Sequence, residues 1–335
     1  MIPFSILDLA PITEGSTARV ALQNSQKLAV AAEEKGFHRV WLAEHHGMRG
    51  VASSATAVVL GHIGAATQHI RIGSGGIMLP NHSPLVIAEQ FGTLASLFPD
   101  RVDLGLGRAP GTDMATAKAL RRNTATQLDT YRGDVLELQS YLSSPKPKQT
   151  IIAIPGVDSQ VPLWMLGSSL YSAKLAADLG LPYSFASHFA PEQLLDALSL
   201  YRAGFTPSKQ CKHPYVMAGV MAVIADTDEE ANYLFTSVQQ QFINMNRGIN
   251  SPFVKPIDHI SEICTPPEKA MLAHILRYAM VGSKQTVTDK LQQFIKATEI
   301  DELIVSTPIF DIQARLKSVN LLSEVGLMQK FIANK

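Results

Sequence analysis

The stretch Glu44-His45-His46 carries three groups that can do acid/base or metal chemistry. It directly follows Arg39–Ala43 (RVWLA), an apolar run that predicts a β-strand. An imidazole near a carboxylate can act as a general acid or base at neutral pH. A metal site is disfavoured, because neighbouring residues on a strand point to opposite faces and at most two of the three could face one centre. A buried, hydrogen-bonded histidine remains the structural alternative for His45.

Two neighbouring strand ends indicate anion binding. Arg108 follows Gly107 after the run Val102–Leu106, and an arginine fork beside a flexible glycine suits phosphate or carboxylate. The next strand, Pro162–Leu166, leads into a serine-rich helix start, whose hydroxyls and free amides either cap the helix or hold a phosphate. The serines are Ser168, Ser169 and Ser172. Together the two strand ends predict one phosphate site, with a salt bridge as the structural alternative for Arg108.

The elements that must position these residues follow one repeated pattern. Ile70–Asp113 has the order strand, loop, helix, strand, which predicts a βαβ unit with a right-handed crossover and both carboxyl strand ends on one face. Its first strand ends in Gly75-Gly76. Eight strand patterns, each followed by a helical pattern, can be counted along the 335 residues. This α/β repeat predicts a (β/α)8 TIM barrel rather than a doubly wound sheet, with the active site at the carboxyl ends of the strands.

A single domain is predicted over residues 1–335. Three stretches within it have patterns of their own. The helix predicted over Ser53–Thr67 has small residues on one face, which allows another helix to approach closely. Ser143–Val161 is polar and proline-rich, and predicts a surface insertion. Arg247–Pro267 is broken by glycine and proline and lacks periodicity, so we expect a lid or flexible insertion after the seventh strand.

Composition narrows the class of protein. Lys and Arg number 29, equal to Asp and Glu, which argues against nucleic acid or an anionic membrane surface as a partner. The two cysteines, Cys211 and Cys264, have no metal-site spacing and are expected to be free thiols. The amino terminus has no signal-peptide pattern, and no run is long and apolar enough for a membrane span. We therefore expect a cytoplasmic protein that acts on a small molecule.

Several longer motifs resemble one family. The motifs are LAEHH, SGGIMLPNHSP, RVDLGLGRAPG, LGSSLYSAKLAADLGLP and FASHF. Taken together they resemble the bacterial luciferase-like flavin-dependent monooxygenases, and in particular their uncharacterised oxidoreductase branch. The resemblance covers nearly the whole chain. It implies a TIM barrel that binds reduced FMN at its carboxyl face, where the flavin reacts with oxygen.

The resemblance also implies roles for individual residues. His45 falls on the catalytic histidine, with Glu44 orienting it, and Gly75-Gly76 falls on a non-prolyl cis peptide beneath the flavin ring. The phosphate-binding positions fall on Arg108, Ala109, Ser168, Ser169 and Ser172. The chain departs from luciferase itself in two places: Ser168 stands where luciferase has a glutamate, and Gly107 stands where it has a reactive cysteine. Light emission and long-chain aldehyde substrates are therefore not implied.

These observations lead to one functional expectation. We expect a two-component monooxygenase that receives reduced FMN from a separate flavin reductase and oxidises a small organic substrate with O2. The alternatives are a deazaflavin-dependent dehydrogenase on the same barrel and a flavin-binding protein without turnover. The resemblance also implies a homodimer, with the helix Ser53–Thr67 packed against its symmetry mate.

Overall fold

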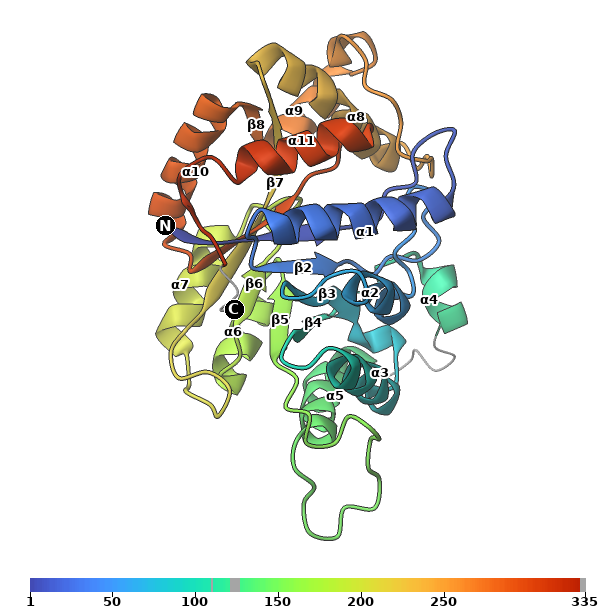
Figure 1. The fold of residues 1–335 in the computed structure, drawn as a ribbon, viewed down its shortest axis with the longest axis vertical. Coiled ribbons are helices and arrows are strands. Elements are labelled where there is room, and N and C mark those ends of the chain that lie inside the picture. The colour runs from blue at the N-terminus through green and yellow to red at the C-terminus, as the bar shows by residue number, and fades with distance from the viewer. Residues whose placement is uncertain (110, 121–126, 332–335) are drawn as a thin grey trace.

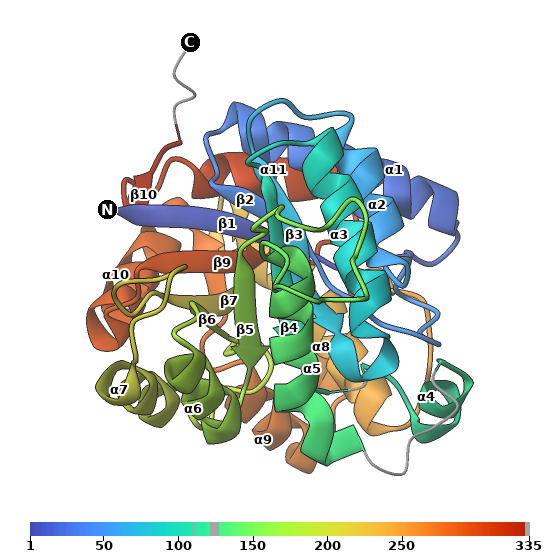
Figure 2. The same cartoon turned by 90° about the horizontal axis from the view of Figure 1, so that it is seen from below.

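The computed structural model of the chain describes residues 1–109, 111–120 and 127–331. Within them, eight parallel strands form a closed barrel with helices around it (Figure 1, Figure 2). Strand β9 pairs with both β1 and β7 and so closes the ring. The barrel strands are β1 (Ile2–Asp8), β2 (Arg39–Leu42), β3 (Arg71–Met78), β4 (Val102–Gly107), β5 (Leu163–Gly167), β6 (Tyr183–Phe185), β7 (Val216–Ala225) and β9 (Glu302–Ser306). The predicted TIM barrel in a single domain is confirmed.

The helices lie outside the barrel, and α1 and α11 run side by side across it in Figure 1. Their bounds are α1 (Ala18–Glu34), α2 (Thr56–Gly64), α3 (Pro84–Leu97), α4 (Met114–Leu120), α5 (Gln127–Leu142), α6 (Leu170–Leu179), α7 (Leu194–Gly204), α8 (Asp228–Asn246), α9 (Pro266–Ile275), α10 (Lys284–Thr298) and α11 (Ile312–Leu322). Short 3-10 turns occur at η1 (Leu79–Asn81) and η2 (Ile260–Glu262). Among the described residues, no helix has both the length and the apolar character needed to cross a membrane.

The sequence pattern predicts the barrel strands well and some other elements less well. The eight strands counted in the sequence are the eight strands of the barrel, whereas β8 (Met280–Ser283), which pairs with the outer half of β7, was not predicted. The helix expected over Ser53–Thr67 is shorter, Thr56–Gly64, and the helical stretch expected over Met114–Leu142 contains α4 and α5, with residues 121–126 outside the described part.

A buried charge network closes the amino-terminal end of the barrel. Arg39 donates to Asp103 at 2.6 Å and to Glu302 at 2.8 Å, and its side chain is almost fully buried. Arg71 pairs with the same Asp103, and the Tyr215 hydroxyl donates to Glu302 at 2.9 Å. Burial by itself would raise the pKa of Asp103, but the charges of Arg39 and Arg71 hold it below its usual range. Because this end is filled, a ligand must enter from the carboxyl ends of the strands.

Two irregular segments extend the barrel. The loop between α5 and β5 projects away from it in Figure 1, in agreement with the insertion expected over Ser143–Val161. The segment Arg247–Pro267 contains η2 and the start of α9. Phe253 in this segment is buried and pairs with Thr13 after β1, where its amide donates to the Ile12 carbonyl at 2.9 Å. The segment is therefore held at its middle against the loop that follows β1.

Candidate functional site

His45 lies just beyond the carboxyl end of β2. Its amide donates to the Ser53 carbonyl at 3.0 Å, and the Ser53 hydroxyl donates to the Ala43 carbonyl at 2.6 Å, so the chain on both sides of the histidine is fixed. The ring Nδ1 atom is buried and has no hydrogen-bond partner among the described residues. Burial lowers the pKa of His45 below its ordinary value. Because this imidazole is neutral and its Nδ1 atom is unused among the described residues, a bound ligand can form a hydrogen bond with it.

A second histidine, His188, reaches the same region from the carboxyl end of β6. It too has a buried Nδ1 atom without a partner among the described residues. Burial, and after it the nearby charge of His45, lowers the pKa of His188 to about 4. Gly219 on β7 makes room for the ring, because a Cβ atom there would lie 2.4 Å from the His188 Nδ1. The barrel mouth thus holds two neutral imidazoles, each with an unsatisfied nitrogen.

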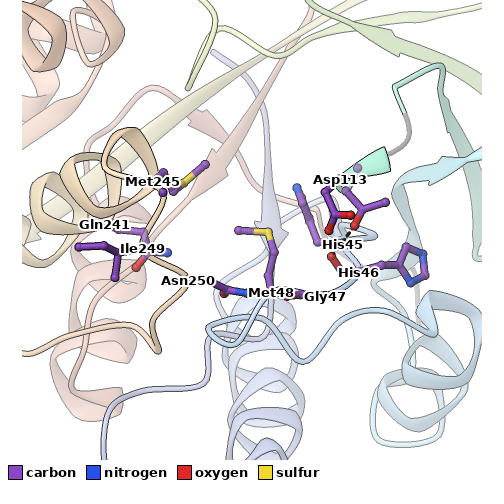
Figure 3. Close-up of a pocket in the computed structure, with 12 residues that line it drawn as sticks. His45, His46, Gly47, Met48, Asp113, Gln241, Met245, Ile249 and Asn250 are labelled. Atoms are coloured by element: carbon purple, nitrogen blue, oxygen red, sulfur yellow. Dashed lines mark hydrogen bonds between the residues drawn. The ribbon is translucent and has the colours of Figure 1, made fainter. Parts of the chain in front are cut away.

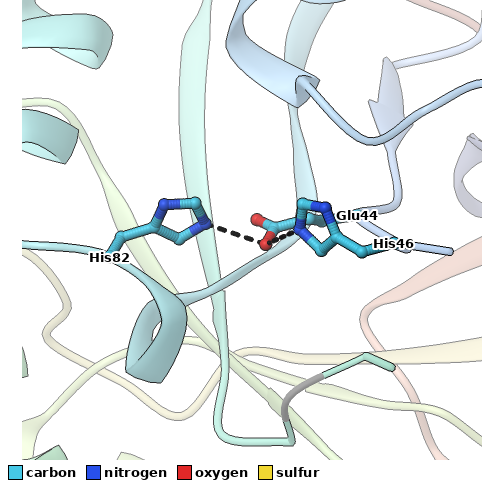
Figure 4. A group of neighbouring side chains, drawn as sticks. All are labelled: Glu44, His46 and His82. Carbon is cyan, nitrogen blue, oxygen red and sulfur yellow. Dashed lines mark hydrogen bonds and ion pairs between the residues drawn. The ribbon is translucent and has the colours of Figure 1, made fainter. Parts of the chain in front are cut away.

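Glu44 does not orient His45, so that expectation is wrong. Its Oε1 atom lies 2.8 Å from the Nε2 atom of His46 and 2.8 Å from the Nε2 atom of His82 (Figure 4). Its Oε2 atom accepts a hydrogen bond from the Met78 amide at 3.1 Å. The physical reason is the alternation along an extended chain, which sends Glu44 and His46 to one side and His45 to the other. Burial would raise the pKa of Glu44, but the hydrogen bonds from His82 and His46 hold it below its usual range.

Gly75 and Gly76 lie on β3, between the strands that carry His45 and Arg108. The peptide bond that joins them is cis, so this expectation is confirmed. A Cβ atom on Gly75 would lie 2.7 Å from the Leu7 side chain, and one on Gly76 would lie 2.8 Å from the Gly105 carbonyl oxygen. Close packing of the neighbouring strands therefore leaves no room for a side chain at either position.

Arg108 follows β4 and reaches the start of helix α6. Its guanidinium carbon lies 4.1 Å from the centre of the Tyr171 ring, a cation–π contact. Ala109 follows it at the surface. Tyr171 is the second residue of α6, so the structure brings the arginine and the serine-rich helix start together, as the sequence predicted.

The serines at the start of α6 differ in what they offer. Ser168 is partly exposed, and Ser169 is the N-cap residue but makes no side-chain capping bond, so its hydroxyl is available. The Ser172 hydroxyl is buried, donates to the Ser169 carbonyl at 2.8 Å and lies 3.0 Å from the Tyr183 hydroxyl. Ser172 therefore supports the helix start, while Ser168 and Ser169 face outward.

Tyr131 on α5 adds a polar atom to this anion site that the sequence did not reveal. Its hydroxyl is buried without a partner among the described residues. Burial and the neighbouring Tyr171 raise its pKa, whereas the Arg108 charge opposes that rise. The hydroxyl therefore lies within electrostatic range of the arginine. A long, weakly patterned helix gives no signal for such a residue.

A cavity of about 410 Å³ opens beside His45 (Figure 3). His45, His46 and Asp113 form one side of it, Gln241, Met245 and Ile249 form the other, and Met48 and Asn250 lie between. Thioether and aliphatic groups thus line one side of the cavity, and an imidazole and a carboxylate, those of His45 and Asp113, line the other. The residues from 248 to 250 belong to the segment expected to be a lid, and their position at the cavity agrees with a covering role.

Other polar residues at strand ends form ion pairs or hydrogen bonds within the protein. Asp8 is fully buried and pairs with Arg315 of α11 at 2.7 Å, which fixes the last helix to the first strand. The Ser187 hydroxyl donates to the Gly219 carbonyl at 2.6 Å. The sequence pattern also did not predict a role for His82, because it belongs to a loop after a different strand from Glu44.

The chain is similar to known proteins over nearly its whole length. A model of the luciferase-like monooxygenase family matches residues 2–301. A luciferase-like monooxygenase of Escherichia coli (strain K12) is 49% identical over 97% of each chain. An N-acetyl-S-alkylcysteine monooxygenase of Bacillus subtilis (strain 168) is 32% identical over 98% of this chain and 100% of its own. The crystal structure of apo-MsnO8 superposes with a TM-score of 0.87 at 32% identity, covering 98% of this chain and 100% of MsnO8.

Proposed function

Because the chain belongs to the luciferase-like monooxygenase family, we propose that it oxidises a small organic substrate with O2 and reduced FMN, which a separate flavin reductase supplies. The observation that carries this proposal is the order of groups around the barrel. His45 follows β2, the cis Gly75-Gly76 bond lies on β3, and Arg108 follows β4. These strands are direct neighbours, and their carboxyl ends share one face.

The phosphate of FMN would bind where Arg108 meets the start of α6. A phosphate carries nearly two negative charges and favours an arginine fork together with the free amides of a helix amino terminus. The Ser168 and Ser169 hydroxyls and the unpartnered Tyr131 hydroxyl supply further donors. From there the flavin ring would extend over Gly75-Gly76, where neither residue has a side chain that could obstruct it.

His45 would act as the acid/base group. When bound, reduced FMN supplies the two electrons that activate O2, and the oxygen chemistry belongs to the cofactor. The part of the protein is to move protons and exclude water. A buried, neutral imidazole can take a proton from the substrate and return it, and its unpartnered Nδ1 atom is available for this. Glu44, which binds His46 and His82, would hold the loop that carries His45 rather than the ring itself.

The cavity beside His45 would take the substrate. Its lining is partly apolar, with Met48, Met245 and Ile249, and its volume of about 410 Å³ suits a small organic molecule. The Arg247–Pro267 segment would cover it as a lid. A relative acts on N-acetyl-S-alkylcysteines, as its name states, so small thioethers are the first substrates to test.

The test separates this proposal from its alternatives. Full-length protein is titrated with FMN, reduced FMN, riboflavin and a deazaflavin, and oxygen uptake is then followed with NADH and a flavin reductase across a panel of thioethers. We expect tight binding of reduced FMN and substrate-dependent product formation. Preference for the deazaflavin would establish the dehydrogenase instead. Flavin binding without turnover on any substrate in the panel would favour a flavin-binding protein.

A further inference from the structure

Three side chains converge at one carboxylate oxygen of Glu44. Glu44 and His46 come from the loop after β2, and His82 comes from the end of η1 (Figure 4). In Figure 4 the two histidines approach one carboxylate oxygen from opposite sides. The three possible ligand atoms all lie within 4.8 Å of one another. Within the described part of the chain, this is the one group of His, Cys, Asp or Glu side chains that converges in this way.

We propose that Glu44, His46 and His82 form a binding site for a divalent transition-metal cation of the zinc type. Two imidazoles and one carboxylate are a ligand set that zinc accepts with one coordination position left to water. Ligand distances of about 2.0–2.1 Å in a tetrahedral site place neighbouring ligand atoms roughly 3.3 Å apart. The two separations from Oε1 are 2.8 Å, and the two Nε2 atoms lie within 4.8 Å of each other. Side-chain shifts of roughly 1 Å or less would therefore bring the three atoms to the separations of a tetrahedral site.

The carboxylate is already oriented for this role. The Met78 amide holds Glu44 Oε2 at 3.1 Å, which directs Oε1 toward both imidazoles. The Glu44 side chain is only 1% exposed and already fixed, so cation binding costs it little further conformational entropy. No lysine or arginine of the described residues forms an ion pair with it. A cation would therefore meet a buried carboxylate that the Nε2 atoms of both rings already face.

Both histidines can present their Nε2 atom as a metal ligand. Binding a metal through Nε2 requires the ring proton to sit on Nδ1, and the two tautomers exchange easily when nothing holds Nδ1. Among the described residues, no hydrogen bond reaches the Nδ1 atom of either His46 or His82. Their side chains are 13% and 24% exposed, so water can satisfy Nδ1 and a cation can enter from that side.

A bound cation would join two loops of the barrel mouth. It would tie the end of β2 to η1, the turn that follows β3, and so brace the loop that carries His45. Metal binding and folding are coupled, so the cation should stabilise the folded protein. This inference does not rest on flavin binding, because none of the three ligands is among the groups proposed to hold FMN.

The test uses full-length, flavin-free protein treated with a chelator and then dialysed. Zinc is titrated against a chromogenic zinc chelator, and thermal unfolding is recorded with and without zinc. We expect one zinc per chain and a higher unfolding temperature. Glu44→Gln and His82→Gln should each weaken zinc binding by about tenfold or more, the equivalent of at least 1.4 kcal/mol. The matched control is His213→Gln, at an exposed position, which should bind zinc as the wild type does.

A readout without any variant guards against folding defects. Cobalt added to the wild-type protein should produce the intense visible bands of a site with four or five ligands, and zinc should abolish them. The proposal is overturned if the wild type takes up no zinc and shows no such bands. It is also overturned if Glu44→Gln and His82→Gln, folded by circular dichroism, bind zinc as tightly as His213→Gln. The cluster would then be a hydrogen-bond network only.

Discussion

The central carbon of the Arg108 guanidinium lies 4.1 Å from the centre of the Tyr171 ring. This contact fixes a charged fork at the amino terminus of α6. Removal of the fork should cost about 1.5–3 kcal/mol, the usual value of hydrogen bonds to a charged group. Arg108→Ala should therefore weaken FMN binding by roughly ten- to a hundredfold.

Riboflavin, which lacks the phosphate, is the matched ligand for this prediction. Its dissociation constant should hardly change in Arg108→Ala. Flavin fluorescence titration measures both constants on the same preparation. An equal loss of affinity for FMN and riboflavin would mean that the arginine supports the fold, and the phosphate role would have to be abandoned.

The second prediction concerns acid stability and His188. The folded protein keeps this histidine neutral, with a pKa of about 4 against 6.5 in the unfolded chain. Between these values the unfolded chain binds the proton and the folded protein does not, so the free energy of unfolding falls as the pH falls from 6.5 to 4. The loss amounts to about 3 kcal/mol across that range and is absent at neutral pH. Other buried groups, His45 included, add to the same trend.

The variant His188→Gln cannot take up this proton. We expect its stability to depend less steeply on pH between 4 and 6.5 than that of the wild type. Urea unfolding at several pH values gives the slope, and the surface variant His69→Gln is the control. If His188→Gln and the wild type show the same slope, then the histidine is solvated or paired in solution.

The third prediction tests the close approach of β3 and β4. A Cβ atom on Gly105 would lie 2.2 Å from the Ser74 carbonyl oxygen, and a backbone atom cannot yield as a side chain does. Gly105→Ala should lower the free energy of unfolding by about 3 kcal/mol, the upper range for overpacking. Gly133→Ala is the control. Gly133 lies within α5, and a Cβ atom there would meet nothing within 4 Å. It should be neutral or slightly stabilising. Chemical denaturation measures the stability of both variants, and equal stability would refute the packing argument.

The sequence predicts what depends on local periodicity. The order of the barrel strands and the cis Gly75-Gly76 bond implied by the family resemblance agree with the structure. The alternation that excluded a shared centre for Glu44, His45 and His46 also holds, since His45 lies apart from the other two.

Sequence patterns do not predict contacts between distant segments. Glu44 binds His82 from 38 positions away, and Arg39 binds Glu302 from 263 positions away. Neither pair has a spacing that a periodic pattern could reveal, because the barrel closure and the loop paths bring them together. The expectation that Glu44 orients His45 fails for a related reason, because the folded chain gives Glu44 two other partners, His46 and His82.

The fourth prediction concerns assembly. In the described part of the chain, α2 and α3 leave large apolar side chains in solvent, with Val58 74% exposed and Leu97 63% exposed. Such a surface favours association, and we expect a homodimer of twice 36.4 kDa that packs these helices together. Light scattering should report the dimer for the wild type and a monomer for Val58→Arg. The surface variant Lys174→Glu, on α6, is the charge-change control. A wild-type monomer at micromolar concentration would contradict the prediction.

The last prediction concerns the Arg247–Pro267 segment as a lid. Asn250 fastens it to the loop after β2: its Oδ1 atom accepts from the Arg49 amide at 2.8 Å, and its Nδ2 atom donates to the Gly47 carbonyl at 2.7 Å. Asn250→Ala removes both bonds and should favour the open form by about 1–3 kcal/mol. Limited proteolysis should then cut within the segment roughly five- to a hundredfold faster.

Opening should also affect catalysis in a specific way. Water admitted to the site wastes reduced flavin, so Asn250→Ala should release more hydrogen peroxide per O2 consumed while FMN binding stays near normal. Asn246→Ala is the matched control, because Asn246 is exposed at the end of α8 and the same chemical change there leaves the two bonds intact. If both variants are cut at the same rate and couple oxygen equally well, Asn250 does not hold a lid. If Asn250→Ala is cut first outside residues 247–267, the cover over the cavity must be sought in another loop.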